Sequence, residues 1–280
     1  MATLKVNTIS GIGTEGVVLD GGLKFRSKNY MTLPKGNTTD AFPDFKAVPA
    51  ASARGIFAGG ISEPSPTRHN EIDFITIATT GNAIDFGDRT ITKNGPGGLS
   101  NQTRGIFMGG GNPQPQSDVI DYITIASLGN ATDFGDMTFT RANGQGDGAS
   151  SPTRGVFSGG GNPSASGNDN GRMNTIDKIE ILTTGNAVDF GDLVETATNI
   201  GGAGNAIRGI FFAGETPSLV NTIQFVIMSS QGGSNHFGDL SFGKIGHNGA
   251  VANSTRAVTA GGYTDPAYSS LIEFVTIATT

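Results

Sequence analysis

The stretch Arg54-Gly-Ile-Phe-Ala-Gly-Gly60 decides the fold, because the chain repeats it at regular intervals. Close copies begin at Arg104 and Arg154 and drifted copies at Arg208 and Arg256, so successive copies are 50, 50, 54 and 48 residues apart. Internal repetition with a period of about 50 residues is typical of proteins built from similar structural units. The sequence therefore predicts five units that share one fold.

Two further strings repeat in step with the first. Ile-Asp-Phe-Ile-Thr-Ile and its relatives begin at Ile72, Ile120, Ile176, Ile223 and Ile272. Gly-Asn-Ala-x-Asp-Phe-Gly-Asp begins at Gly81, Gly129 and Gly185, with a weaker copy that ends at Asp239. All three strings are short, rich in β-branched and aromatic residues, and separated by Gly, Pro, Asn and Ser, which is typical of strands and turns. Each unit is therefore predicted to be a small antiparallel sheet.

One unit shows the predicted strands most clearly. Within residues 93–138 they are 95–101, 104–110, 120–126 and 131–138. Four antiparallel strands make one blade of a β-propeller, in which the blades surround a central axis. The first strand of each unit consists mainly of small residues, which fit where inner strands crowd round that axis. We therefore expect an all-β fold, a five-bladed β-propeller.

The two ends of the repeat region complement each other. The last unit stops at Thr280 without the third string, whereas residues 36–44 carry a lone copy of it with one inserted residue. Residues 36–46 are therefore predicted to complete the blade formed by residues 242–280, which would close the ring and cover two sheet edges. The expected domain organisation is an extended N-terminal arm, residues 1–35, followed by the propeller, residues 36–280.

The composition argues against several classes of function. The 280 residues include 44 glycines, 3 histidines and no cysteine. Without cysteine there is no disulfide, thiolate catalysis or Cys-based zinc site, and we expect neither a metal nor a cofactor. The net charge of −6 gives no attraction to nucleic-acid phosphates or to an anionic membrane surface. Since no apolar run could span a bilayer, we expect neither a nucleic-acid partner nor membrane insertion.

The Gly-Gly doublet that ends the second predicted strand, and the four-stranded unit of about 50 residues, resemble kelch repeats. The chain lacks the usual kelch tryptophan, and phenylalanines of the third string are expected to take its packing role: Phe86, Phe134, Phe190 and Phe237. The amino-acid sequence of the repeats, together with that of the opening segment ATLKVNTISGIGTEGVVLDGGLKFRSKNYMTLPKG, resembles the sequences of kelch-like virion proteins of tailed phages that infect marine cyanobacteria. This resemblance covers the whole chain and implies a non-enzymatic virion component, either a tail or fibre part or a capsid decoration.

Two sets of charged residues recur in register with the repeats. The arginines that open the first string form one set: Arg54, Arg104, Arg154, Arg208 and Arg256. Carboxylates of the third string form the other set: Asp85, Asp88, Asp133, Asp136, Asp189, Asp192 and Asp239. Because a catalytic pair would normally be unique, we interpret both sets as structural and expect arginine–carboxylate pairs within or between blades. A cation bound between two carboxylates, or acid–base chemistry, is the alternative.

The connections between strands differ on the two faces of the predicted ring. Those between the third and fourth strands share a Gly-Asn pair, which suits tight hairpins. Those between the second and third strands vary from unit to unit, and binding often resides in variable loops on a rigid scaffold. The side chains there that could stack on or hydrogen-bond a sugar are Arg68, His69, Arg172, Tyr263 and Tyr268. The alternative is that these loops are simply solvated.

The arm of residues 1–35 contains short apolar segments with strand-forming residues, namely Leu4, Val6, Ile9, Val17, Val18 and Leu19. Addition of such strands to a neighbouring subunit is a common mode of attachment. We therefore expect a non-enzymatic structural protein of the virion, oligomeric within the particle and bound to other phage virion proteins through its arm. The alternative is a host-receptor or carbohydrate-binding adhesin that contacts a host-surface glycan through the variable-loop face.

Overall fold

The computed structural model describes residues 54–62, 67–111, 116–141, 148–161, 171–244 and 249–278. The chain divides into two compact units, Met1–Ala50 and Ala51–Thr280, and every described residue belongs to the second unit. The predicted arm, the predicted strand at residues 36–46 and all six arm residues that we named lie outside the described residues. Their structure therefore stays a prediction.

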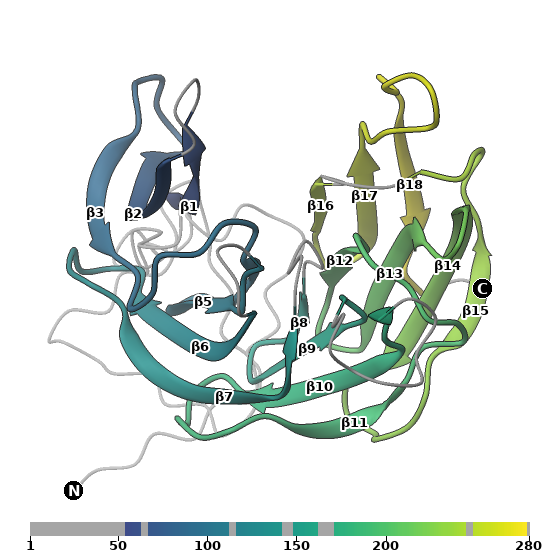
Figure 1. Ribbon diagram of the computed structural model, residues 1–280, viewed down its shortest axis with the longest axis horizontal. Helices are drawn as coiled ribbons and strands as arrows, with labels where there is room; N and C mark the ends of the chain where they lie inside the picture. The colour runs from purple at the N-terminus through teal and green to yellow at the C-terminus, as the bar shows by residue number, and fades with distance from the viewer. Residues whose placement is uncertain are drawn as a thin grey trace, which may run out of the picture. The chain divides into compact units, whose positions relative to one another are not determined.

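Eighteen strands are described, and they form five antiparallel sheets (Figure 1). The first sheet contains β1 (Arg54–Ser62), β2 (Thr67–Thr76) and β3 (Ile84–Asp88). The second contains β4 (Gly97–Ser100), β5 (Arg104–Met108), β6 (Ser117–Thr124) and β7 (Thr132–Arg141). The third contains β8 (Ala149–Ser150), β9 (Arg154–Ser158), β10 (Thr175–Glu180) and β11 (Val188–Asp192). The fourth contains β12 (Gly201–Gly204), β13 (Arg208–Glu215), β14 (Leu219–Ile227) and β15 (Asn235–Asp239), and the fifth β16 (Gly249–Ala252), β17 (Arg256–Ala260) and β18 (Ile272–Thr276).

Each sheet is one blade, because its strands follow one another in sequence and each pairs with the next. The five blades form a five-bladed β-propeller, which confirms the fold predicted from the repeats. The first and last sheets each show three described strands. The residues before Arg54 and residues 279–280 lie outside the described part of the chain.

In three copies of the Asp-Phe-Gly-Asp string, the glycine occupies a position that only glycine fits. The pairing of the fourth strand shifts its register at this point, for example between Ile120 and Asp121 on β6. Gly135 there has a φ of 143°, and a Cβ on it would lie 2.6 Å from the backbone of Gly185 in the next blade. Gly87 and Gly191 repeat this geometry. The string thus encodes both a bulge and a close approach between blades.

The hydrophobic core lies between blades rather than in one centre. Four clusters of buried apolar side chains each combine residues of two consecutive blades. Between the first and second blades, for example, Ile72 and Phe86 pack with Phe107 and Ile123. The phenylalanines of the third string take part in these clusters, as predicted: Phe86, Phe134 and Phe190 are buried and Phe237 is partly buried.

The Gly-Asn connections do not form the tight hairpins that we expected. The connection from β6 to β7 runs over residues 125–131, and its glycine and alanine turn toward the preceding blade. Gly129 N donates to Phe86 O at 2.8 Å, and Ala131 N donates to Asp88 O at 2.7 Å. Contacts between blades therefore override the local hairpin preference of the Gly-Asn pair.

Candidate functional site

The loop between β17 and β18 presents a pair of tyrosines. The rings of Tyr263 and Tyr268 have centroids 5.4 Å apart at an interplanar angle of 62°, and Tyr268 is 83% exposed. The Tyr263 hydroxyl donates to Asp265 Oδ1 at 3.1 Å; this bond first, and the nearby negative charge, raise the pKa of the phenol. An exposed aromatic ring with polar neighbours is suited to stack on the apolar face of a sugar.

Main-chain bonds hold this loop in shape. Gly261 N donates to Leu271 O at 2.9 Å, Ser269 N to Gly262 O at 2.8 Å, and Thr264 N to Ala267 O at 2.8 Å. The loop therefore continues the β17–β18 hairpin and presents its tyrosines from a hydrogen-bonded frame. A preformed loop loses less conformational entropy on binding than a disordered one.

A second polar cluster lies at the β1–β2 connection. His69 Nδ1 is 3.1 Å from Glu71 Oε2, and His69 Nε2 is 3.0 Å from Ser62 Oγ. Hydrogen bonds, from the backbone first and then from His69, lower the pKa of Glu71. All three side chains are substantially exposed, and no other blade has a histidine at this position. The order hydroxyl, imidazole, carboxylate also occurs in nucleophilic enzymes, so this cluster needs a direct chemical test.

The predicted ligand-binding residues fall into separate places. Arg172 pairs with Glu215 of the fourth blade at 2.8 Å and so joins two blades. Arg68 lies on β2 opposite Ile61 and is partly buried. Within the described residues, Arg172, His69 and the tyrosine pair form no hydrogen bond or ion pair with one another. Sequence reasoning missed Ser62 and Glu71, since neither belongs to a repeated string.

The repeat arginines do not pair with the repeat carboxylates, so that expectation is corrected. Four of them donate instead to a main-chain carbonyl of the next blade: Arg54 to Ile125, Arg104 to Ile181, Arg154 to Met228 and Arg208 to Ile277. Four of the five also lie over an aromatic ring of their own blade, as Arg104 does over Tyr122 at 4.4 Å. Arg154 pairs with Glu180. We call the arginine-to-carbonyl bond the inter-blade staple.

Two of the repeat carboxylates bond locally at the strand bulges. Asp85 and Asp189 accept from the backbone N of the glycine two residues on, at 3.1 and 3.2 Å. Asp239 lies 3.4 Å from His236, which takes the place of an aspartate in the repeat. No group of three or more His, Asp or Glu side chains in the described segments is placed to hold a metal ion. The bulge geometry explains Asp85 and Asp189, because the main-chain N–H of each bulge glycine finds its acceptor there.

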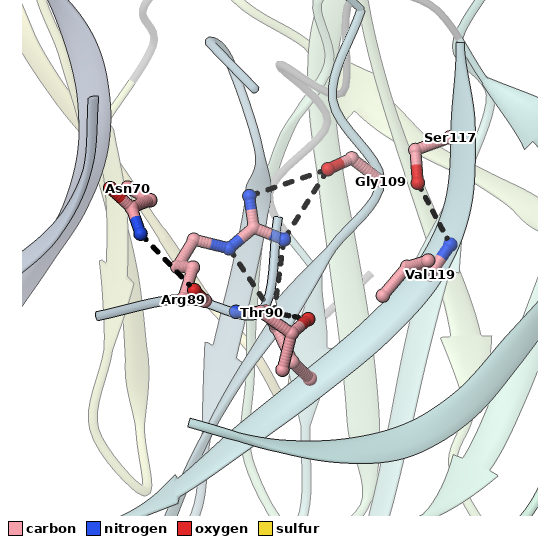
Figure 2. A network of polar contacts seen from close by, with 7 residues as sticks. Asn70, Arg89, Thr90, Gly109, Ser117 and Val119 are labelled. Atoms are coloured by element: carbon pink, nitrogen blue, oxygen red, sulfur yellow. Dashed lines mark hydrogen bonds and ion pairs between the residues drawn. The ribbon is translucent and has the colours of Figure 1, made fainter. Parts of the chain in front are cut away.

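The buried carboxylates belong to the second repeated string and not to the third. They stand at the second residue of that string, directly after its isoleucine. Asp121 is fully buried and accepts from Arg89 Nη2 at 3.0 Å and from Thr90 N and Oγ1 at 2.9 Å each. The same guanidinium donates to Gly109 O, and Asn70 Nδ2 donates to the Arg89 carbonyl (Figure 2). One carboxylate thereby holds the end of the first blade against the second.

The same arrangement recurs at three more blade interfaces. Asp177 accepts from Arg141 Nη2 at 2.7 Å and from the Thr138 hydroxyl at 2.6 Å. Its counterparts in the fourth and fifth blades are Gln224, which accepts from Val194 N at 2.8 Å, and Glu273, which accepts from Ser241 N at 2.9 Å. We call such an acceptor, together with the hydrogen bonds that it accepts from the preceding blade, the inter-blade clasp. Burial lowers the pKa of Arg141, and Asp177 opposes that effect by stabilising the cation.

A cavity of about 810 Å³ lies among the inner strands. Its described lining consists largely of glycine, alanine and serine, with asparagines such as Asn101 and Asn205. These asparagines are already engaged: Asn101 Nδ2 donates to Pro152 O and Asn205 Nδ2 to Ser254 O, each at 2.9 Å. The cavity therefore offers main-chain and small polar groups, and its asparagines link neighbouring blades.

Together, the repeated inter-blade contacts and the non-repeated loops define a five-bladed β-propeller, a fold suited to a binding or structural role. No protein-family model matches the chain, and no curated protein matches it. Among solved structures, the structure of YjhT is similar: the TM-score is 0.63 at 10% identity, covering 80% of this chain and 78% of that one. At this identity the likeness shows the fold alone, and nothing in it indicates a phage origin. Within the described part of the chain, no helix has the length and apolarity needed to span a bilayer.

Proposed function

We propose that this protein is a non-enzymatic structural protein that displays a five-bladed propeller on a phage particle. The main observation for this proposal is that the repeated charged side chains hold neighbouring blades together. The repeat arginines and the buried carboxylates are engaged in staples and clasps between blades. They build a rigid scaffold, and the side chains that differ from blade to blade lie in its loops.

The phage assignment rests on the resemblance of the repeats and of the opening segment to virion proteins of tailed cyanophages. In this proposal residues 1–35 attach the propeller to other virion proteins by adding their strand-prone segments to a neighbouring sheet. The protein would then be located in the virion, in several copies, as a tail or fibre part or as a capsid decoration.

Incorporation into particles tests this proposal. The full chain and a variant that lacks residues 1–35 are expressed during infection, and purified particles are examined by mass spectrometry. We expect the full chain in the particles and the shortened chain only in the lysate, although both fold. Equal incorporation of both chains would show that the arm is not the anchor, and absence of both would refute the particle assignment.

A second function, glycan binding through the loop face, is favoured by the tyrosine pair on the β17–β18 loop. Tyr268 presents an exposed ring from a hydrogen-bonded loop. On a glycan array, Tyr268→Ala should abolish any binding that the wild type shows, because stacking needs the ring. Phe242→Ala is the matched control, since this exposed aromatic side chain lies outside that loop. An array without signal for the wild type would refute glycan binding and leave the structural role.

A further inference from the structure

The loop between β17 and β18, residues 261–271, combines two tyrosines with one carboxylate. The main chains of Tyr263 and Tyr268 pair as an isolated β-bridge, and the centroids of their rings lie 5.4 Å apart. Asp265 stands between them in the sequence, is exposed, and accepts from the Tyr263 hydroxyl at 3.1 Å. The loop therefore presents aromatic rings and an ionic hydrogen-bond acceptor in one small frame.

Asp265 keeps acceptor capacity for a ligand. A carboxylate at neutral pH has two oxygens with about four acceptor sites, and the Tyr263 hydroxyl uses one of them on Oδ1. Hydrogen bonds to an ionised acceptor are stronger than those between neutral groups, so sugar hydroxyls donate well to a carboxylate. A sugar that stacks on the exposed ring of Tyr268 can therefore donate its hydroxyls to this acceptor.

The loop contains no basic side chain that would balance an acidic ligand, since residues 261–271 include no lysine, arginine or histidine. Two other basic residues that we predicted for the loop face are already paired with glutamates. Arg172 donates to Glu215 at 2.8 Å, and His69 lies 3.1 Å from Glu71. Recognition of carboxylate and phosphate groups normally uses arginine or lysine. The charges at this loop therefore favour a ligand that carries no negative charge.

We propose that the β17–β18 loop binds glycans without acidic groups, by stacking one sugar on Tyr268 and accepting its hydroxyls at Asp265. This inference rests on the glycan-binding function proposed above and names the class of glycan. An acidic sugar in the same position brings its negative charge close to Asp265. Two like charges 4 Å apart in water repel each other by an energy that corresponds to about a fivefold loss of affinity.

A glycan array that holds neutral glycans beside their sialylated and sulfated forms tests this selectivity. At low ionic strength the full-length wild type should bind neutral glycans and should bind their acidic forms about fivefold more weakly or worse. Acidic forms that bind equally well or better would overturn the selectivity and leave glycan binding in place. An array without any signal for the wild type would refute both glycan binding and this inference.

Asp265→Asn separates the charge of the loop from its shape. The amide oxygen can still accept from the Tyr263 hydroxyl, so the loop keeps this hydrogen bond but loses the negative charge. The best neutral glycan and its sulfated form are titrated against each variant, and the ratio of the two Kd values is compared. We expect this ratio to fall from about fivefold in the wild type to below about twofold in Asp265→Asn. Asp133→Asn is the matched control, because that exposed carboxylate lies on β7, and it should keep the wild-type ratio.

Salt gives a second test on the unmodified full chain, which does not depend on a variant folding. At about 1 M salt the screening length falls to about 3 Å, so the repulsion between Asp265 and an acidic sugar is largely screened. The ratio of the two Kd values should therefore fall toward one in the wild type. A ratio that changes neither with salt nor in a folded Asp265→Asn variant would show that the charge of Asp265 does not select the glycan, and would overturn the proposal.

Discussion

Asp177→Ala should destabilise the propeller strongly while changing no surface contact. The carboxylate is fully buried and accepts from the Arg141 guanidinium at 2.7 Å and from the Thr138 hydroxyl at 2.6 Å. Removing one partner of such a pair leaves the other charge uncompensated, which costs about 3–5 kcal/mol. Since native domains are stable by only about 5–15 kcal/mol, the variant should lose a large fraction of its free energy of unfolding.

Urea unfolding at pH 7, followed by far-UV circular dichroism, measures this loss. Asp133→Ala is the matched control, because that carboxylate is exposed on β7, and surface substitutions usually change stability by less than about 0.5 kcal/mol. Arg141→Met combined with Asp177→Leu should recover part of the loss, because an apolar pair leaves no buried charge. A free energy of unfolding for Asp177→Ala within about 1 kcal/mol of the wild-type value, which is about twice the usual effect of a surface substitution, would show that the clasp does not hold the blades together.

Three further outcomes are expected. Gly135→Ala should lower the free energy of unfolding by about 2–4 kcal/mol, because the φ of Gly135 is 143° and a Cβ there would meet the next blade. Gly249→Ala, where a Cβ has open space, should lower it by less than about 1 kcal/mol. Equal melting temperatures of the two variants would contradict this. Burial alone would raise the pKa of Glu273, but hydrogen bonds from Ser241 and the nearby lysine outweigh it and lower the pKa. Ionised Glu273 therefore stabilises the fold at pH values above its ordinary pKa, and this stabilisation is lost as the pH falls through the lowered pKa. Glu273→Gln should therefore flatten the acid side of a plot of the free energy of unfolding against pH. A fluorophosphonate probe should not label Ser62; labelling abolished by Ser62→Ala would reveal a nucleophile.

The strand order could be predicted from the sequence, because three strings repeat in the same order and each is short, apolar and bounded by turn residues. The strands Arg104–Met108 and Ser117–Thr124 lie close to the predicted 104–110 and 120–126. The packing role of the phenylalanines followed from the same repetition. Strand identity depends on local pattern, which a single sequence contains.

The partners of the charged residues could not be predicted, because they depend on which blades meet. Repetition led us to interpret the arginines as structural, but it could not name their acceptors, which are carbonyl oxygens about 70 residues away, as in the bond from Arg104 to Ile181. The cations of the clasps have no common place in the repeat. Arg89 directly follows the third string, whereas Arg141 lies five residues after Asp136. An aspartate in an otherwise apolar strand, such as Asp121 or Asp177, was the available signal of a buried acceptor.

The binding role of the loop residues stays a prediction, and the structure shows only how these side chains are placed. Tyr263 and Tyr268 lie together on one loop, and His69 has the polar neighbours that a ligand contact needs. Arg172 pairs with Glu215 of the adjacent blade, a partner that the sequence did not indicate, and its part in binding stays a prediction. Loop side chains are placed by tertiary contacts, so their grouping cannot be read from composition alone.

Electron cryomicroscopy of intact phage particles tests the proposed function most directly. If the protein is a displayed virion component, five-bladed rings should appear at the particle surface, each joined to a neighbouring protein through its N-terminal segment, and labelling of the β17–β18 loop should mark the outward face. Particles that lack such rings, while the protein accumulates free in the infected cell, would contradict the assignment.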